Sequence, residues 1–407
     1  MYPRFARDRV QDALADTPAV LIHGPRQCGK TTLARAIGAD LGHEYVTFDD
    51  DTVRRAADAD PMGFVSRLPD RVILDEVQRV PQVFPALKFA IDRERTEGRF
   101  LLTGSANVLL VPTMTESLAG RMETVRLHPL AQCELRGVRS GFLAAAFHDG
   151  FAAVPRVERE SLPELIVAGG FPPALARKSA PRRAAWYREY IDAIVQRDVR
   201  DLARVRSLDV LPRLIELLAG HTACLLNITE LAGPFSVSRP TIREYVTLLE
   251  RVFAVVETPA WHSSTMKRLI KAPKLHVADT GIVTSALGMG VPELADDRSR
   301  YGRILESFVA NELMRMASFD DEPTRFSHWR DKDGYEVDVV LERGARLVGV
   351  EVKAAWTVRD SDFRGLRRLR DALGSRFACG IVLHDGEALV PFGDRLWAVP
   401  TSGLWNR

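Results

Sequence analysis

The sequence has few cysteines and little net charge, and both shortages limit the class of protein. Only four of the 407 residues are cysteine, and they lie far apart: Cys28, Cys133, Cys224 and Cys379. No Cys-x-x-Cys pair is present, which argues against a zinc ribbon or a disulfide framework and favours a reducing, cytoplasmic environment. The formal net charge is +2. Any surface that attracts nucleic acid must therefore be local.

Long apolar runs are absent as well. No stretch of about 18 apolar residues exists that would cross a membrane as a helix. The segment Met1–Leu14 mixes both charge signs without an apolar centre, so we do not expect a secretory signal. We expect an amphipathic helix there, with Phe5, Val10 and Leu14 facing inward. With 46% apolar and 27% charged residues, the chain is typical of a globular protein of about two to three domains.

The most informative stretch follows the apolar run Ala19–Ile22, which is typical of a buried strand. It matches the pattern G-x-x-x-x-G-K-[ST] at every fixed position, and we predict that these residues bind the nucleotide: Gly24, Pro25, Arg26, Gln27, Cys28, Gly29, Lys30, Thr31 and Thr32. Backbone N–H groups in such a turn form a nest for phosphate oxygens, and the following helix directs its positive end at the same anion. Lys30 should contact the β- and γ-phosphates, while the Thr31 hydroxyl binds Mg²⁺. The loop alone predicts either ATP or GTP.

A suitable pair of acids lies downstream. The apolar stretch from Arg71 ends in Asp75 and Glu76. We expect Asp75 to hold Mg²⁺ through its water shell, and Glu76 to polarise the attacking water as general base. A glycine turn or a strand-end acid pair is common when it occurs alone. The two together predict a nucleotide-hydrolysing site.

The remaining pattern of residues 1–150 predicts a parallel sheet with helices on both faces. Further strands are expected at Glu44–Phe48, Arg99–Thr103 and Thr124–Leu127, with a helix around Phe84–Glu94. One strand should lie between the phosphate-loop strand and the acid strand. This arrangement is typical of ATPases that carry an added catalytic glutamate.

Polar residues near the end of this region are further candidates for catalysis. Ser105 or Asn107, just after a strand, is placed to sense the γ-phosphate and orient the water, although an ordinary N-capping turn explains either residue as well. Arg121 follows a glycine and is our candidate for the cation that phosphoryl transfer needs, supplied in cis or in trans. A plain surface arginine is the alternative. If the protein forms a homo-oligomer, Arg121 would complete a neighbour's site.

These motifs together resemble the AAA-type ATP-binding proteins of bacteria and archaea, a family whose C-terminal half is classed as a domain of unknown function. The resemblance rests on the stretches 24–32, 72–78, 101–107, 117–122 and 127–135, and it continues at 169–172, 196–199 and 279–287. It implies ATP rather than GTP. It also implies that Lys30, Thr31, Asp75 and Glu76 bind nucleotide and metal.

The pattern of residues 151–265 predicts a helical region that contains a winged helix-turn-helix. The recognition helix is predicted over Ser238–Arg251, with its apolar positions at helical spacing. The polar positions of this helix would face a DNA groove: Arg239, Thr241, Arg243 and Glu244. Such folds also serve as packing modules in oligomeric ATPases, so both interpretations remain open.

Residues 266–407 carry four charged positions that stand out. Glu306 lies on an expected helix, Asp338 on a strand, and Glu351 and Lys353 on the next strand. This order resembles the restriction-endonuclease-like nuclease superfamily. The resemblance implies that carboxylates such as Asp338 and Glu351, with Glu306, hold Mg²⁺, and that Lys353 orients the attacking water. An ion-paired strand face is the alternative.

The sequence therefore predicts an α/β protein of three parts: a P-loop ATPase domain (1–150), a helical and winged-helix region (151–265) and a nuclease-like α/β domain (266–407). ATP and Mg²⁺ are the expected cofactors. The leading hypothesis is an ATP-driven enzyme acting on nucleic acid, DNA rather than RNA. The contrasting hypothesis is a nucleotide-dependent switch or scaffold whose C-terminal domain is catalytically silent and binds a protein partner or DNA.

Overall fold

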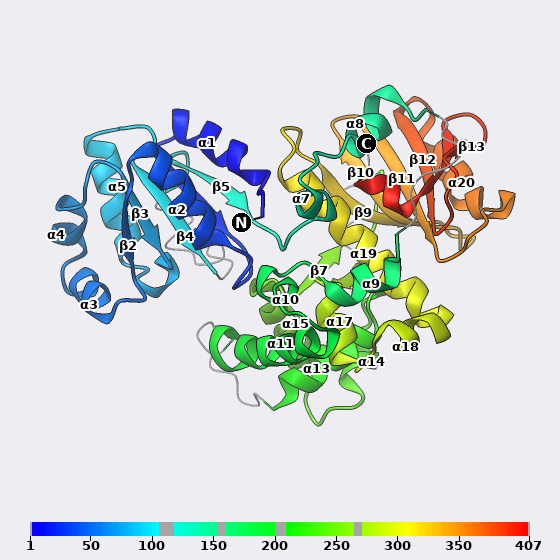
Figure 1. Ribbon diagram of the computed structural model, residues 1–407, viewed down its shortest axis with the longest axis horizontal. Helices are drawn as coiled ribbons and strands as arrows, with labels where there is room; N and C mark the ends of the chain where they lie inside the picture. The colour runs from blue at the N-terminus through cyan, green and yellow to red at the C-terminus, as the bar shows by residue number, and fades with distance from the viewer. Residues whose placement is uncertain (1, 106–117, 153–159, 200–208, 264–270, 406–407) are drawn as a thin grey trace. The chain divides into compact units, whose positions relative to one another are not determined.

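The computed structural model describes residues 2–105, 118–152, 160–199, 209–263 and 271–405 (Figure 1). The chain separates into two compact units, which we describe one at a time. The nucleotide unit comprises residues 1–130 with 251–253, and the C-terminal unit comprises residues 131–250 with 254–407. The three predicted domain boundaries stay predictions. In the described part of the chain no helix is long and apolar enough to cross a membrane.

The nucleotide unit is built on a parallel sheet of five strands in the order β2-β3-β4-β1-β5. The strands are β1 (Ala19–His23), β2 (Glu44–Thr47), β3 (Val72–Asp75), β4 (Phe100–Gly104) and β5 (Met122–Arg126). Helices α1 (Ala6–Asp16), α2 (Lys30–Leu41), α3 (Asp51–Ala59), α4 (Pro61–Ser66) and α5 (Val83–Arg93) complete the unit. Strand β4 lies between β1 and β3, so the predicted intervening strand is confirmed.

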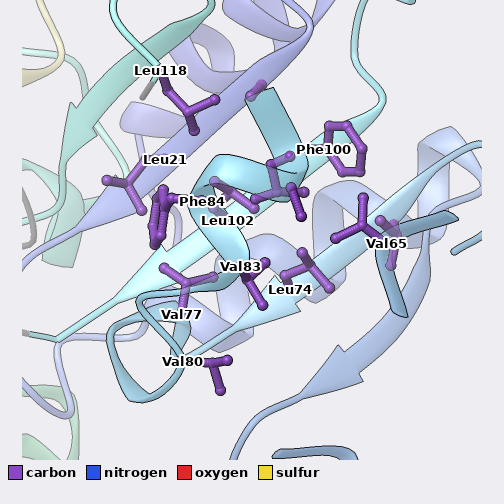
Figure 2. Close-up of a cluster of buried hydrophobic side chains, with 14 of the residues drawn as sticks. Leu21, Val65, Leu74, Val77, Val80, Val83, Phe84, Phe100, Leu102 and Leu118 are labelled. Atoms are coloured by element: carbon purple, nitrogen blue, oxygen red, sulfur yellow. The ribbon is translucent and has the colours of Figure 1, made fainter. Parts of the chain in front are cut away.

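Apolar side chains from strands and helices form the core beside this sheet. Figure 2 shows Leu21, Leu74 and Leu102 of the central strands beside Phe84 of α5, and all four are fully buried. Every residue of β1, β3 and β4 is buried, as expected for parallel strands that are covered on both faces. The buried strands hold their carboxyl ends in fixed register, and the candidate residues follow those ends.

The first part of the C-terminal unit is mainly helical. Its elements are α7 (Gln132–Arg136), α8 (Phe142–Ala144), α9 (Leu162–Ala168), α10 (Pro172–Leu175), α11 (Ala180–Ala193), α13 (Val210–Gly220), α14 (Ile228–Ala232) and α15 (Arg239–Arg251). Strands β6 (Cys224–Leu225), β7 (Val255–Thr258) and β8 (Lys274–Val277) form an antiparallel sheet with β8 in the centre. Helix α15 lies where the recognition helix was predicted, and Ile242, Tyr245, Val246 and Leu249 are buried as expected.

The rest of the C-terminal unit contains a second, mixed sheet in the order β13-β14-β12-β11-β10-β9. Its strands are β9 (Arg325–Arg330), β10 (Glu336–Arg343), β11 (Arg346–Lys353), β12 (Phe377–His384), β13 (Val390–Pro391) and β14 (Leu396–Pro400). The helices of this part are α17 (Thr280–Ala286), α18 (Val291–Asp296), α19 (Arg298–Ser318) and α20 (Arg364–Leu373). Strands β9, β10 and β11 are antiparallel, whereas β12 runs parallel to β11.

Candidate functional site

The phosphate loop connects β1 to α2 and depends on residues that accept unusual backbone angles. Gly24 has φ +156°, and a Cβ on it would lie 2.1 Å from the carbonyl oxygen of Leu127. Gly29, which precedes α2, has φ +103°, and Gln27 is left-handed with φ 59°. Only glycine satisfies both the angle and the close approach at Gly24. The sequence of the loop thus permits the tight turn that a phosphate nest requires.

Lys30 and Thr31 are the first two residues of helix α2. The buried Lys30 Nζ donates hydrogen bonds to the carbonyl oxygens of Gly24 at 3.0 Å and Pro25 at 2.8 Å. The Thr31 hydroxyl donates to Asp75 Oδ1 at 2.8 Å. These bonds hold the ammonium inside the loop and join the loop to the end of β3.

The other predicted loop residues differ in exposure. Cys28 is fully buried, and its thiol donates to the Leu127 carbonyl oxygen at 3.4 Å, so this side chain packs beneath the loop. Gln27 and Thr32 are exposed, while Arg26 is half-buried. Nucleotide binding by all of the predicted loop residues stays a prediction.

Asp75 is the last residue of β3, and its carboxylate accepts hydrogen bonds from three hydroxyl groups. Besides Thr31, the hydroxyls of Thr103 and Tyr45 donate to its carboxylate, the latter at 2.8 Å. Burial and the hydrogen bond to Asp75 raise the pKa of Tyr45 to about 12. A buried carboxylate beside a threonine hydroxyl is a set of hard oxygen donors that suits Mg²⁺. These residues therefore fit a bound Mg²⁺ ion.

Glu76 directly follows β3 and is held in place by two neighbouring side chains. Its backbone is left-handed, with φ 59° and ψ 45°, which is a costly conformation for a residue other than glycine. The carboxylate accepts hydrogen bonds from Ser105 Oγ at 3.0 Å and from the Gln78 amide. Ser105 thus contacts the predicted general base, whereas Asn107 lies outside the described residues. Sequence reasoning did not assign Gln78 a role, although it is only two residues from Glu76.

Arg4 is a further contact of the loop that the sequence did not reveal. Its guanidinium donates to the carbonyl oxygens of Cys28 and His128, each at 2.7 Å. A lone arginine ahead of an amphipathic helix has no motif to distinguish it. Nearby, His23 ends β1, and burial, with Arg126 and Lys30, lowers its pKa to about 4.

Arg121 is engaged by a carboxylate of its own unit. Its guanidinium pairs with Asp92 of α5, with Nε–Oδ1 at 2.5 Å and Nη2–Oδ2 at 3.1 Å. The hydrogen bond from Arg121 lowers the pKa of Asp92. This pairing matches the surface-arginine alternative. A role for Arg121 in phosphoryl transfer stays a prediction.

The predicted residues of the C-terminal unit do come together, with a lysine that the sequence did not reveal. Lys274 of β8 donates to Glu306 Oε1 of α19 at 2.6 Å and to Asp338 Oδ1 of β10 at 3.2 Å. Lys353 donates to Glu351 Oε1, its neighbour on β11, at 2.7 Å. The exposed fractions of the Lys274, Glu306, Asp338 and Glu351 side chains are 12% or less. We call these five residues the carboxyl–lysine cluster.

Burial and mutual repulsion shape the charges of this cluster. Burial, with the nearby Asp338, raises the pKa of Glu351 to about 8, and the same two causes raise that of Glu306. Burial opposes the charge on Lys274, but Asp338 and Glu306 outweigh it and raise its pKa. Lys274 is therefore a charged ammonium at neutral pH.

The cluster does not fit the predicted Mg²⁺ site. The Lys274 ammonium lies between two of the expected ligands, and Asp338 Oδ2 already accepts from the Val352 amide at 2.9 Å. Among the residues that the structure describes, no group of three or more His, Cys, Asp or Glu side chains is arranged to hold a metal ion. We derive no metal-dependent step in this unit.

A second buried network in the same unit explains two motifs of the sequence. Asp279 is fully buried and accepts from the amides of Gly170 and Gly281 at 2.8 and 2.9 Å. It also pairs with Arg315 at 2.8 Å, and Arg315 pairs with Glu312 at 2.8 Å. The stretches around Gly170 and Asp279 therefore have a structural role in packing this unit.

Three family models together match most of the chain. Residues 16–136 match the model of an AAA domain, and residues 159–293 and 301–404 match two domains of unknown function, DUF8612 and DUF4143. The uncharacterised protein Rv2008c of Mycobacterium tuberculosis is 32% identical over 403 residues, which cover 98% of this chain and 84% of that protein. The chain belongs to the same family. Protein MJ1544 of Methanocaldococcus jannaschii, also uncharacterised, is 24% identical over 79% of this chain and 71% of its own length.

Solved structures resemble the chain more loosely. The Walker-type ATPase PABY2304 of Pyrococcus abyssi has 18% identity and a TM-score of 0.39, covering 70% of this chain and 96% of that one. The Thermotoga maritima RuvB Holliday junction branch migration motor has 19% identity and a TM-score of 0.28, covering 62% and 89%. The family matches confirm the AAA-type P-loop domain and the C-terminal domain of unknown function. The nuclease-like identity of that domain stays a prediction.

Proposed function

We propose that this protein binds ATP with Mg²⁺ and hydrolyses it in the nucleotide unit. The observation that carries the proposal is the convergence of Lys30, Thr31, Asp75 and Glu76 from α2 and β3 at one edge of the sheet. Phosphoryl transfer requires positioning and charge stabilisation more than covalent chemistry. A glycine-rich loop, a lysine, a hydroxyl–carboxylate pair and a base supply these requirements.

Each residue has a separate task in this proposal. Lys30 leaves the carbonyl oxygens of Gly24 and Pro25 to contact the β- and γ-phosphates, which are stronger partners than neutral carbonyls. Thr31 and Asp75 hold Mg²⁺, which would neutralise charge on the phosphates. Glu76 accepts a proton from the attacking water, while the hydrogen bond from Ser105 orients its carboxylate.

ATP turnover by the purified full chain tests this proposal. Lys30→Ala should abolish ATP binding, measured by fluorescence of a labelled nucleotide, while Lys88→Ala on α5 of the same unit should leave it intact. Glu76→Gln should keep binding and lower kcat by about 10²- to 10⁴-fold, the usual contribution of a general base. Undiminished turnover in Lys30→Ala would contradict the assignment.

For the C-terminal unit we propose a nuclease-like fold that contacts DNA without cutting it. The element order supports the fold, because α19 precedes the antiparallel strands β9, β10 and β11, and α20 leads to the parallel strand β12. The lysine between Glu306 and Asp338 favours a catalytically silent domain over Mg²⁺-dependent cleavage. The protein would then be a nucleotide-dependent switch, as in the second sequence hypothesis.

DNA contact is proposed through α15, the predicted recognition helix of a winged helix. The order of α13, β6, α14, α15, β7 and β8 supports that fold. Arg239, Arg243 and Glu244 are exposed, while Thr241 is half-buried and Arg243 also pairs with Glu257. Arg239→Ala should weaken binding to a labelled DNA duplex and reduce its dependence on salt. Equal binding by Arg239→Ala and wild type would overturn the contact.

A further inference from the structure

We propose that Lys274 is the resident cation of the carboxyl–lysine cluster, and that its ammonium occupies the position that a divalent metal ion would need. The proposal rests on the nuclease-like fold proposed above, because that fold implies a metal ion at Glu306, Asp338 and Glu351. The proposal explains why the wild-type chain would not bind a metal ion at these three carboxylates. It is independent of ATP hydrolysis in the nucleotide unit.

The geometry supplies the first argument. Lys274 Nζ contacts carboxylate oxygens from two different elements, α19 and β10, at 2.6 and 3.2 Å. A metal ion held by Glu306 and Asp338 would meet the ammonium charge at the same two carboxylates. The lysine side chain is only 7% exposed, so it does not share these oxygens with solvent. One cation therefore excludes the other.

The backbone of Lys274 supplies the second argument, since it fixes the lysine in place. Strand β8 is the central strand of its sheet, and Lys274 pairs with Leu225 on one side and Thr258 on the other. The Lys274 carbonyl oxygen also accepts from the Thr258 hydroxyl at 3.1 Å. The Lys274 backbone is therefore held on both sides, and its Nζ is held by the two hydrogen bonds to Glu306 and Asp338.

The charges and the remaining contacts supply the third argument. Removing Lys274 takes away the positive charge that lies against Glu306 and Asp338, and with it the repulsion that a divalent ion would meet there. Glu306 Oε1 and Asp338 Oδ1 would each lose their lysine partner. Glu351 Oε2 is buried and, among the described residues, accepts no hydrogen bond. Three oxygens would then be open to a hard cation such as Mg²⁺ or Mn²⁺.

The experiment measures Mn²⁺ binding to the nucleotide-free full chain, using the electron paramagnetic resonance signal of free Mn²⁺. Lys274→Ala should gain one site with affinity at least about tenfold above that of wild type, because the oxygens are freed and the repulsion is removed. Lys332→Ala, which removes an exposed lysine of the same unit, should behave like wild type. Adding Asp338→Asn to Lys274→Ala should abolish the gained site. If Lys274→Ala does not fold, Lys274→Met keeps the apolar stem and serves instead.

The outcomes separate this proposal from the one on which it rests. A Mn²⁺ site in wild type that Asp338→Asn removes would overturn the role of Lys274 and leave the nuclease-like metal site standing. If Mn²⁺ finds no site in wild type or in either Lys274 variant, both the role of Lys274 and the nuclease-like metal site are overturned. A gained site that depends on Asp338 supports both. Melting curves give a second measurement, since Mn²⁺ should raise the Tm of Lys274→Ala but not that of Lys332→Ala.

Discussion

Replacing Arg315 with methionine should destabilise the C-terminal unit strongly. Arg315 is 3% exposed and pairs at 2.8 Å with both Asp279 and Glu312, whose exposed fractions are 1% or less. Methionine fills much of the volume but leaves two buried carboxylates without their cation. Removing one partner of a buried ion pair costs about 3–5 kcal/mol. That loss is a large part of the roughly 5–15 kcal/mol by which a domain is stable.

Differential scanning calorimetry of the full chain measures this effect. For a unit of this size each kcal/mol lowers Tm by about 2–4 °C, so we expect a fall on the order of 10 °C in the transition of the C-terminal unit. Arg300→Met is the matched control, because Arg300 lies on the same helix α19 and pairs with Asp297 in an exposed position. An exposed pair contributes at most about 1 kcal/mol.

Two outcomes would refute the reasoning. Equal melting of Arg315→Met and Arg300→Met would show that the buried carboxylates find other partners at no cost. Glu312→Leu can also be added to Arg315→Met. If the double variant has the same lowered Tm as Arg315→Met alone, an unpaired charge is not the cause. Removing the second charge of a buried pair should restore part of the stability, because an apolar replacement of the whole pair is often neutral.

Three further predictions concern the nucleotide unit. Ser105→Ala should lower ATP turnover by less than Glu76→Gln does, because the base remains but loses a hydrogen bond that orients it; equal losses in a steady-state assay would contradict this positioning role. Arg4→Ala should raise the KM for ATP several-fold by releasing the phosphate loop, whereas Arg7→Ala, which loses only an exposed pair with Asp40, should not. His23 has a folded pKa of about 4 against 6.5 when unfolded, so its stabilising contribution is present above pH 6.5 and is lost as the pH falls toward 4. Between about pH 7.5 and pH 5, the free energy of unfolding of wild type should fall by about 2 kcal/mol more than that of His23→Gln. Urea unfolding measures both proteins, and parallel pH profiles would refute the prediction.

The nucleotide unit was predictable because its signals are local. The motif from Gly24 to Thr31 specifies a loop by residues adjacent in sequence, and the apolar run before Asp75 specifies a strand end. Both appear in the structure at the expected edge of the sheet. The strand between β1 and β3 was also expected, since parallel strands with helical crossovers have few possible arrangements.

The contacts of Arg4 and Lys274 were not predictable, because each depends on residues far away in the chain. Arg4 reaches the carbonyl oxygen of His128, 124 positions later, and Lys274 reaches Asp338, 64 positions later. A single arginine or lysine carries no periodicity or spacing that marks such a contact. The carboxylates of the cluster follow a recognisable order in the sequence, which led to the prediction of a metal ion. Nothing in the sequence marks Lys274 as their partner.

The side chain of Asp279 also has a consequence for the order of folding. It joins Gly170, 109 positions earlier, to Arg315, 36 positions later. Closing such distant segments is slow, because chain entropy is lost before the contacts form. During synthesis the C-terminal unit remains incomplete until helix α19 has emerged. A chain that stops before residue 315 would expose an unneutralised acid at the centre of its helices and become a target for proteolysis.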